Sequence, residues 1–149
     1  MTTPQQQSPR WHILSAVKDA IDTALGADGV STRLVPRTTV QLAAGHRVAV
    51  IEWDGDRIKG GNAVREERTF IMEVTSMVWP TTGDAEAAAD ALHLQLRRVI
   101  HSAMPGLNSL PGVVRVKLTE RDVNPDLDTP LTHGASIRAS WDVDYLTKT

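Results

Sequence analysis

The stretch GASIRASWDVDYLT, residues 134–147, alternates apolar and polar side chains without a break from Ala135 to Tyr145. Its apolar positions are Ala135, Ile137, Ala139, Trp141, Val143 and Tyr145. Successive side chains of a strand point to opposite faces of a sheet, so the pattern predicts a strand with one buried and one polar face. Such a strand is stable only beside other strands and under an apolar layer, which the rest of the chain has to supply.

Four other segments have the composition of strands, namely residues 30–35, 47–53, 68–79 and 113–119. Short links between consecutive strands favour antiparallel pairing. Residues 54–67 and 120–133 are rich in charge and contain glycine or proline, so we expect two long polar loops there.

Two segments have helical periodicity. Residues 10–25 place Leu14, Val17, Ile21 and Leu25 on one face, with Ser8 as N-cap, Pro9 at the first helical position and Gly26 as the stop. A second helix is expected after the capping run at residues 81–84, ending at residues 105–106. Its apolar stripe is rich in alanine, which allows close approach to a sheet.

These elements predict an α+β fold in the order α-β-β-β-α-β-β, with two amphipathic helices packed on one face of a mostly antiparallel sheet. We expect residues 1–8 to be a disordered tail and residues 9–149 to form a single domain, in keeping with a length of 149 residues.

The composition excludes several classes of protein. Lysine and arginine total 16 against 18 aspartate and glutamate, a balance that argues against electrostatically driven nucleic-acid binding. There is no cysteine, so disulfides and thiolate metal sites are excluded. No apolar run approaches the about 18 residues of a membrane span, and the polar N-terminus does not resemble a signal peptide.

Two groups of side chains resemble metal ligands but do not complete a site. Residues 122–128 place oxygens at alternate positions, yet Leu127 stands where a calcium loop needs glycine and His133 where it needs glutamate. Glu86, Asp90 and His93 share one helical face, and nothing else in the sequence completes that set. Without a nucleophile elbow or a phosphate-binding loop, we expect no enzyme activity, no metal and no cofactor.

Tryptophan is the commonest aromatic residue, with four copies against one phenylalanine and one tyrosine. Tryptophan anchors both cores and interfaces. We expect Trp11 and Trp141 to lie in the core. For Trp53 and Trp79 the sequence does not decide between a core position and a subunit interface.

The segment DGDRIKGGNAVREER, residues 54–68, has two interpretations. It is either a solvated hairpin tip or a segment that orders against a neighbouring subunit, where charge complementarity would set the register. In the second case the interface residues would be Arg57, Lys59, Arg65, Glu66, Glu67 and Arg68, meeting acidic partners at Asp122 or Asp126.

The chain resembles the tail terminator, or tail completion, proteins of long-tailed bacteriophages, a family that includes the lambda minor tail protein U. The resemblance rests on the amphipathic helix from Trp11 to Leu25, the strand pair with its long charged loop, and the alanine-rich helix that opens Asp84-Ala85-Glu86. It also rests on the two closing strands, of which the last ends in Tyr145-Leu146-Thr147.

The resemblance implies a structural virion protein that forms a ring, typically a hexamer. Such a ring stacks on the last ring of the tail tube, stops its polymerisation and offers the surface that joins the head. The expected partners are further copies of the chain, the tail tube protein and a head–tail connector or head completion protein. DNA would pass through the lumen without specific contacts, and the location would be the head-proximal end of the tail, after assembly in the host cytoplasm.

Two alternatives remain at the level of sequence. Similar short α+β chains also serve as neck or head-closure connectors. A small cytoplasmic enzyme or ligand-binding regulator would belong to another class, with Glu86, Asp90, His93 and Arg97 as its first candidate residues.

Overall fold

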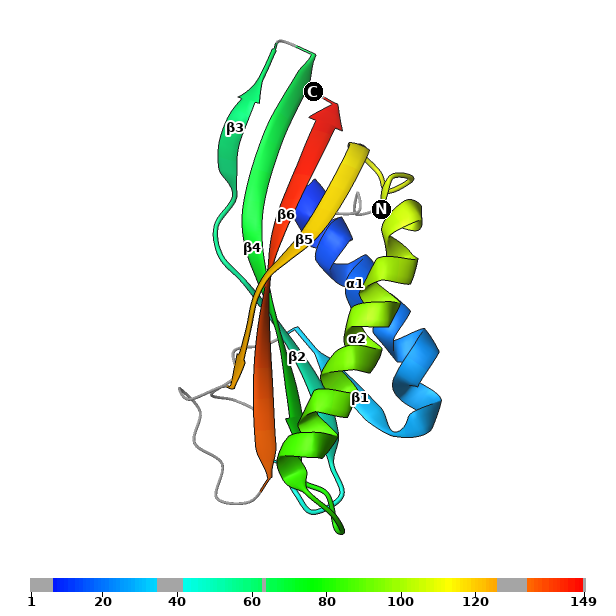
Figure 1. The fold of residues 1–149 in the computed structure, drawn as a ribbon. Helices are drawn as coiled ribbons and strands as arrows, with labels where there is room; N and C mark the ends of the chain where they lie inside the picture. Colours follow the sequence, from blue (N-terminus) through cyan, green and yellow to red (C-terminus); the bar gives the residue numbers. More distant parts are fainter. Residues whose placement is uncertain (1–6, 35–41, 63, 126–133, 149) are drawn as a thin grey trace.

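The computed structural model describes residues 7–34, 42–62, 64–125 and 134–148. Within them, α1 (Pro9–Leu25) and α2 (Ala85–Leu107) lie on one face of a six-stranded sheet (Figure 1). The strands are β1 (Val30–Arg33), β2 (Arg47–Trp53), β3 (Arg57–Gly61), β4 (Arg65–Val78), β5 (Val113–Pro125) and β6 (Ala135–Lys148). The predicted α+β class, with its mostly antiparallel sheet, is confirmed.

The sheet has the order β1-β2-β4-β6-β5, and β3 also pairs with β4. β2 lies beside the second half of β4 and β3 beside its first half, so the two short strands share one flank of the longer one. β1 pairs with β2 in parallel, and every other pair in the described sheet is antiparallel. The two free edges are therefore β1 with β3 on one side and β5 on the other.

Both helices begin where the sequence predicts. The Ser8 side chain accepts a hydrogen bond from Trp11 N at 3.1 Å, and the Asp84 side chain accepts from Glu86 N and Ala87 N. These caps satisfy backbone donors that the first turn leaves without partners. The predicted end of α2 was wrong, since the helix passes Pro105 and runs to Leu107. Leu107 is buried, so packing of the last turn offsets the hydrogen bond that proline cannot donate.

The core lies between the helices and the inner face of the sheet, and Trp141 and Phe70 are its largest fully buried side chains. Trp11 is half-buried at the rim, where its ring packs edge-to-face on Trp53 with centroids 5.7 Å apart. The expectation of a core position is thus confirmed for Trp141, while Trp11 packs against the core from its margin. The outer face of the sheet carries a smaller apolar cluster of Val48, Val50 and Met77.

The sequence misplaced several strand ends. Residues 54–67 do not form one long loop, because they contain β3 and the start of β4. Likewise, β5 continues through residues 120–125, which were expected to be loop, and β1 ends at Arg33 instead of residue 35. In each extended strand the polar backbone is satisfied by pairing with the next strand along the chain. The tail at residues 1–6 and the region 126–133 lie outside the described residues.

We predict that Gly134→Ala destabilises the protein far more than Gly29→Ala. Gly134 has a φ of 100°, and an added Cβ would lie 2.1 Å from the Val78 carbonyl oxygen. Gly29 has a φ of 86° with nothing within 4 Å of the same position. Left-handed backbone alone should cost the Gly29 variant about 1–2 kcal/mol, and the backbone clash should raise the cost of Gly134→Ala to about 3 kcal/mol or more. Urea unfolding of both variants measures the difference in unfolding free energy. Equal losses of unfolding free energy in the two variants would contradict the prediction.

Candidate functional site

The hairpin of β3 and β4 is the most exposed part of the fold. Figure 1 shows its tip reaching past the ends of both helices, so that no helix covers it. All five residues of β3 are exposed. The hairpin contains six of the eight residues that the sequence proposes as a subunit interface, and it therefore forms the candidate site.

Asp54 makes the transition from β2 to β3. Its backbone N donates to the Ile71 carbonyl at 3.0 Å, and its side chain accepts from Ile71 N at 2.6 Å. The same carboxylate accepts from the Arg57 guanidinium at 2.9 Å. One side chain thus replaces a missing backbone partner, and the flank of β4 stays paired while the chain passes from one short strand to the next.

The tip of the hairpin is a tight turn held by Asn62. Its side-chain oxygen accepts from Val64 N at 2.9 Å and from Arg65 N at 3.0 Å, and its backbone N donates to Arg65 O at 2.7 Å. Gly61 precedes it with a φ of 129°, and an added Cβ would lie 2.5 Å from the Arg65 carbonyl. The glycine is required because β3 and β4 approach each other here with no room for a side chain.

A partly buried polar cluster holds the base of the hairpin against β6. The Tyr145 hydroxyl donates to Asp56, and Arg68 forms ion pairs with Asp56 at 3.8 Å and with Glu66. Burial, followed by the hydrogen bond and the negative charge of Asp56, raises the pKa of Tyr145 well above its usual range. Since these groups come from β4, β6 and the β2–β3 connection, the cluster fixes the hairpin to the body of the protein.

Four of the eight predicted interface charges already have partners within the subunit. Arg57 pairs with Asp54, Lys59 with Asp144 at 3.3 Å, and Arg68 with Glu66. Exposed charges without an ion pair to any described residue remain at Arg65, Glu67 and Asp122. The prediction for Asp126 falls outside the described residues.

Exposed apolar side chains occur on both edges of the sheet. Ile58 and Val64 of the hairpin are 64% and 66% exposed, and Val123 of β5 is 42% exposed. Val64 lies next to the unpaired Arg65, and Val123 next to the unpaired Asp122. Each edge therefore offers exposed apolar side chains and unpaired charges. The hairpin carries Arg65 and Glu67, which are opposite in sign, and β5 carries Asp122, whose side chain points to the opposite face of the strand from Val123. The sequence indicated the charges and missed the apolar positions, because a strand had not been assigned there.

The residues first considered for an enzyme separate in the structure. Glu86 and Asp90 are exposed on α2, whereas His93 is buried. His93 Nε2 lies 3.8 Å and Arg97 Nε 3.6 Å from the two carboxylate oxygens of Glu120 on β5. In the described part of the chain, no group of three or more metal-ligating side chains gathers. Glu120 follows Val116 and Leu118 at every second position of β5, so the same alternation would have placed its side chain on the inner face of the sheet.

Over the described ranges, neither helix combines the length and the apolarity needed to cross a membrane. Comparison of the chain with models of known protein families gave no match, and comparison with curated proteins gave no significant match either.

We predict that the single tyrosine of the chain titrates far above its ordinary pKa of about 10, and that Asp56→Asn lowers this pKa. The unfolded chain releases the phenolic proton first, so the stability supplied by Tyr145 is present below about pH 10 and falls as the pH rises further. Ultraviolet absorbance of the phenolate, recorded while circular dichroism confirms folding, measures the titration.

Asp144→Asn is the matched control, because it removes a nearby carboxylate that makes no hydrogen bond to the phenol. A Tyr145 phenol that titrates near pH 10 in the folded wild type would contradict the arrangement at the base of the hairpin.

Proposed function

We propose that this protein is a structural virion protein of the tail terminator kind. It forms a ring that caps the phage tail tube, stops further polymerisation and offers the surface for head joining. The observation that carries the proposal is the exposure of two different sheet edges, the hairpin on one side and the far half of β5, residues 120–125, on the other. Both edges carry exposed apolar side chains, and the unpaired Arg65 of the hairpin is opposite in charge to the unpaired Asp122 of β5.

Two different surfaces that fit each other produce a head-to-tail contact. Such a contact is heterologous, and copies joined by it close into a ring when the rotation between them allows closure. A two-fold dimer would instead need one surface that is complementary to itself. The hairpin and the far half of β5 therefore favour a cyclic assembly over a simple dimer.

The charges favour a staggered contact between neighbouring copies. Across one sheet, Arg57 lies in the same row as Lys117, through Thr69 and Asp144. A neighbour placed level with this row would therefore bring cationic side chains of β3 and β5 together. A neighbour shifted along the strands would place Arg65 near Asp122 and Ile58 or Val64 near Val123, which are attractive contacts.

Apolar burial would supply most of the affinity of this contact. An exposed ion pair such as Arg65 with Asp122 contributes only about 0–1 kcal/mol, whereas burying a valine or isoleucine side chain contributes about 1.5–3 kcal/mol. The charges would set the register, because like charges would meet in other alignments. The ion pairs inside the subunit would keep Arg57, Lys59 and Arg68 in fixed positions during assembly.

A neck or head-closure connector would use the same contact, and assembly assays with tail tubes separate it from a terminator. An enzyme of the second class finds less support, because its candidates His93 and Arg97 contact Glu120 at the seam between α2 and β5. That arrangement favours a role for these residues in packing.

We predict that Ile58→Asp combined with Val64→Asp abolishes ring formation and leaves the subunit folded. Both side chains are exposed, so the unfolding free energy should change by about 0.5 kcal/mol or less. Loss of both apolar contacts should weaken association about a hundredfold per contact. Light scattering, electron microscopy and a tail-joining assay measure the assembly, and thermal unfolding measures the fold.

Ala91→Asp is the matched control, because it adds a carboxylate at an exposed position of α2. Rings that form normally from the double variant would overturn the proposed contact. A wild-type chain that neither forms rings nor limits the length of tail tubes would overturn the proposed function itself.

A further inference from the structure

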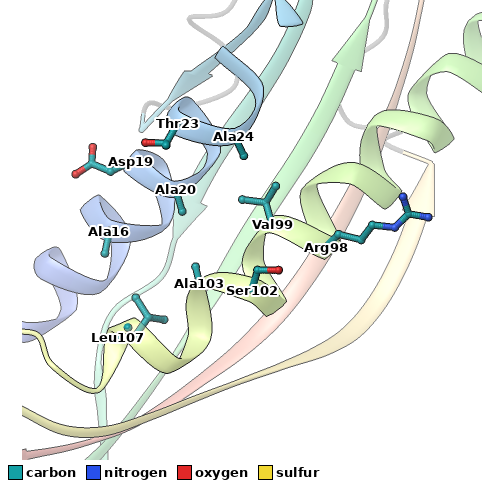
Figure 2. A pocket seen from close by; sticks show the side chains of 11 residues that line it. Ala16, Asp19, Ala20, Thr23, Ala24, Arg98, Val99, Ser102, Ala103 and Leu107 are labelled. Carbon is teal, nitrogen blue, oxygen red and sulfur yellow. The ribbon is translucent and has the colours of Figure 1, made fainter. Parts of the chain in front are cut away.

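A groove of about 660 Å³ runs between α1 and α2 on the side that faces away from the sheet (Figure 2). Its α1 wall is formed by Ala16, Ala20 and Ala24, which repeat at the four-residue spacing of one helix face. Its α2 wall includes Val99, Ala103 and Gly106. Because these side chains are small, the groove stays open, and the helix layer of another molecule could approach it closely.

The two rims of the groove carry opposite charges. Asp19 lies on the α1 rim and Arg98 on the α2 rim, and Figure 2 shows the two side chains pointing away from each other. Both residues are exposed, and neither forms an ion pair with another described residue. The neighbouring charges are already engaged, since Asp22 pairs with Lys18 and Arg97 with Glu120. Asp19 and Arg98 are therefore the charges available to an occupant of the groove.

We propose that the groove binds the same groove of a second copy of this chain, about a two-fold axis that runs along it. α1 and α2 are antiparallel neighbours (Figure 1), so this axis places α1 of each copy over α2 of the other. The α1 rim of one copy, with Asp19, then lies against the α2 rim of the second copy, with Arg98, and the same contact forms in reverse. A second copy satisfies both rims at once, because a two-fold contact repeats each interaction twice.

This contact is separate from the ring contact of the proposed function. It uses the helix layer, whereas the ring contact uses the hairpin and the far half of β5. The variant with Ile58→Asp and Val64→Asp therefore isolates it, since that variant removes the hairpin contact and leaves the groove intact. A chain that fails to form rings would still dimerise through its helices, so the two proposals fail independently.

The test compares full-length charge variants in the Ile58→Asp, Val64→Asp background by sedimentation velocity. The parent should dimerise, and Asp19→Arg alone or Arg98→Asp alone should weaken dimerisation about tenfold or more, because each creates two like-charged pairs. An equimolar mixture of the two single variants should restore a dimer of one copy of each, in which both pairs are attractive. Asp90→Arg, the same charge change at an exposed position of α2 outside the groove, should leave dimerisation unchanged.

Ala24→Trp gives a second, uncharged test, because the bulky side chain would fill the groove and should also prevent dimerisation. A parent that stays monomeric at every concentration would overturn the proposal. Dimerisation that is unchanged in both charge variants would also overturn it. So would single variants that are folded but do not associate when they are mixed.

Discussion

The pairing of β4 with β6 is the constraint on which the rest of the structure depends. The two strands are joined over their full 14 residues, from Arg65 with Lys148 to Val78 with Ala135. β2 and β3 attach along one side of this pair and β5 along the other, and β1 attaches to β2. The inner face of the pair also supplies Phe70 and Trp141 to the core. A slip of one residue would turn these side chains outward, so burial fixes the register.

The length of this pair explains why the molecule has two regions of different character. The helices cover one part of the sheet, and there the core is apolar and closed. Beyond them the strands continue as a hairpin held by polar contacts, including the Tyr145 hydrogen bond to Asp56 and the ion pair of Lys59 with Asp144. Polar contacts between partly exposed groups give orientation more than stability. The hairpin is thus positioned rigidly without needing a core of its own.

The two proposed association surfaces differ in symmetry for a physical reason. The hairpin and the far half of β5 lie on opposite edges of the sheet, so one fits the other only in a head-to-tail arrangement. The helix groove carries Asp19 and Arg98 on its two rims, so it fits a rotated copy of itself. The head-to-tail contact between the sheet edges leaves one edge of each copy free, so further copies can add around a ring. The two-fold contact between the helix grooves uses the same surface of both copies and therefore stops at a dimer.

Local spacing was sufficient to predict the two helices, their N-caps and the alternating strand that ends the chain. Ser8, Asp84 and the apolar repeat of α1 act within one or two turns, so their effect can be read without knowledge of the fold. The same reasoning located the charges of residues 54–68 correctly but assigned them to a loop. It also grouped His93 with Glu86 and Asp90, which share its helix, instead of with Glu120 on a distant strand.

What only the tertiary structure decided is which distant groups meet. Lys59 reaches Asp144 across 85 residues of sequence, and Tyr145 reaches Asp56 across 89. The strand β3 exists because β4 supplies partners for its backbone, and apart from Gly61 at the turn no residue within β3 indicates this pairing. Helical hydrogen bonds join residues four apart and so leave a pattern in the sequence. Alternation likewise reveals a strand, but it does not reveal the partner, because strand pairing joins residues at any separation. The sequence therefore determined the helices and the charges, and the sheet decided where those charges lie and which of them remain free.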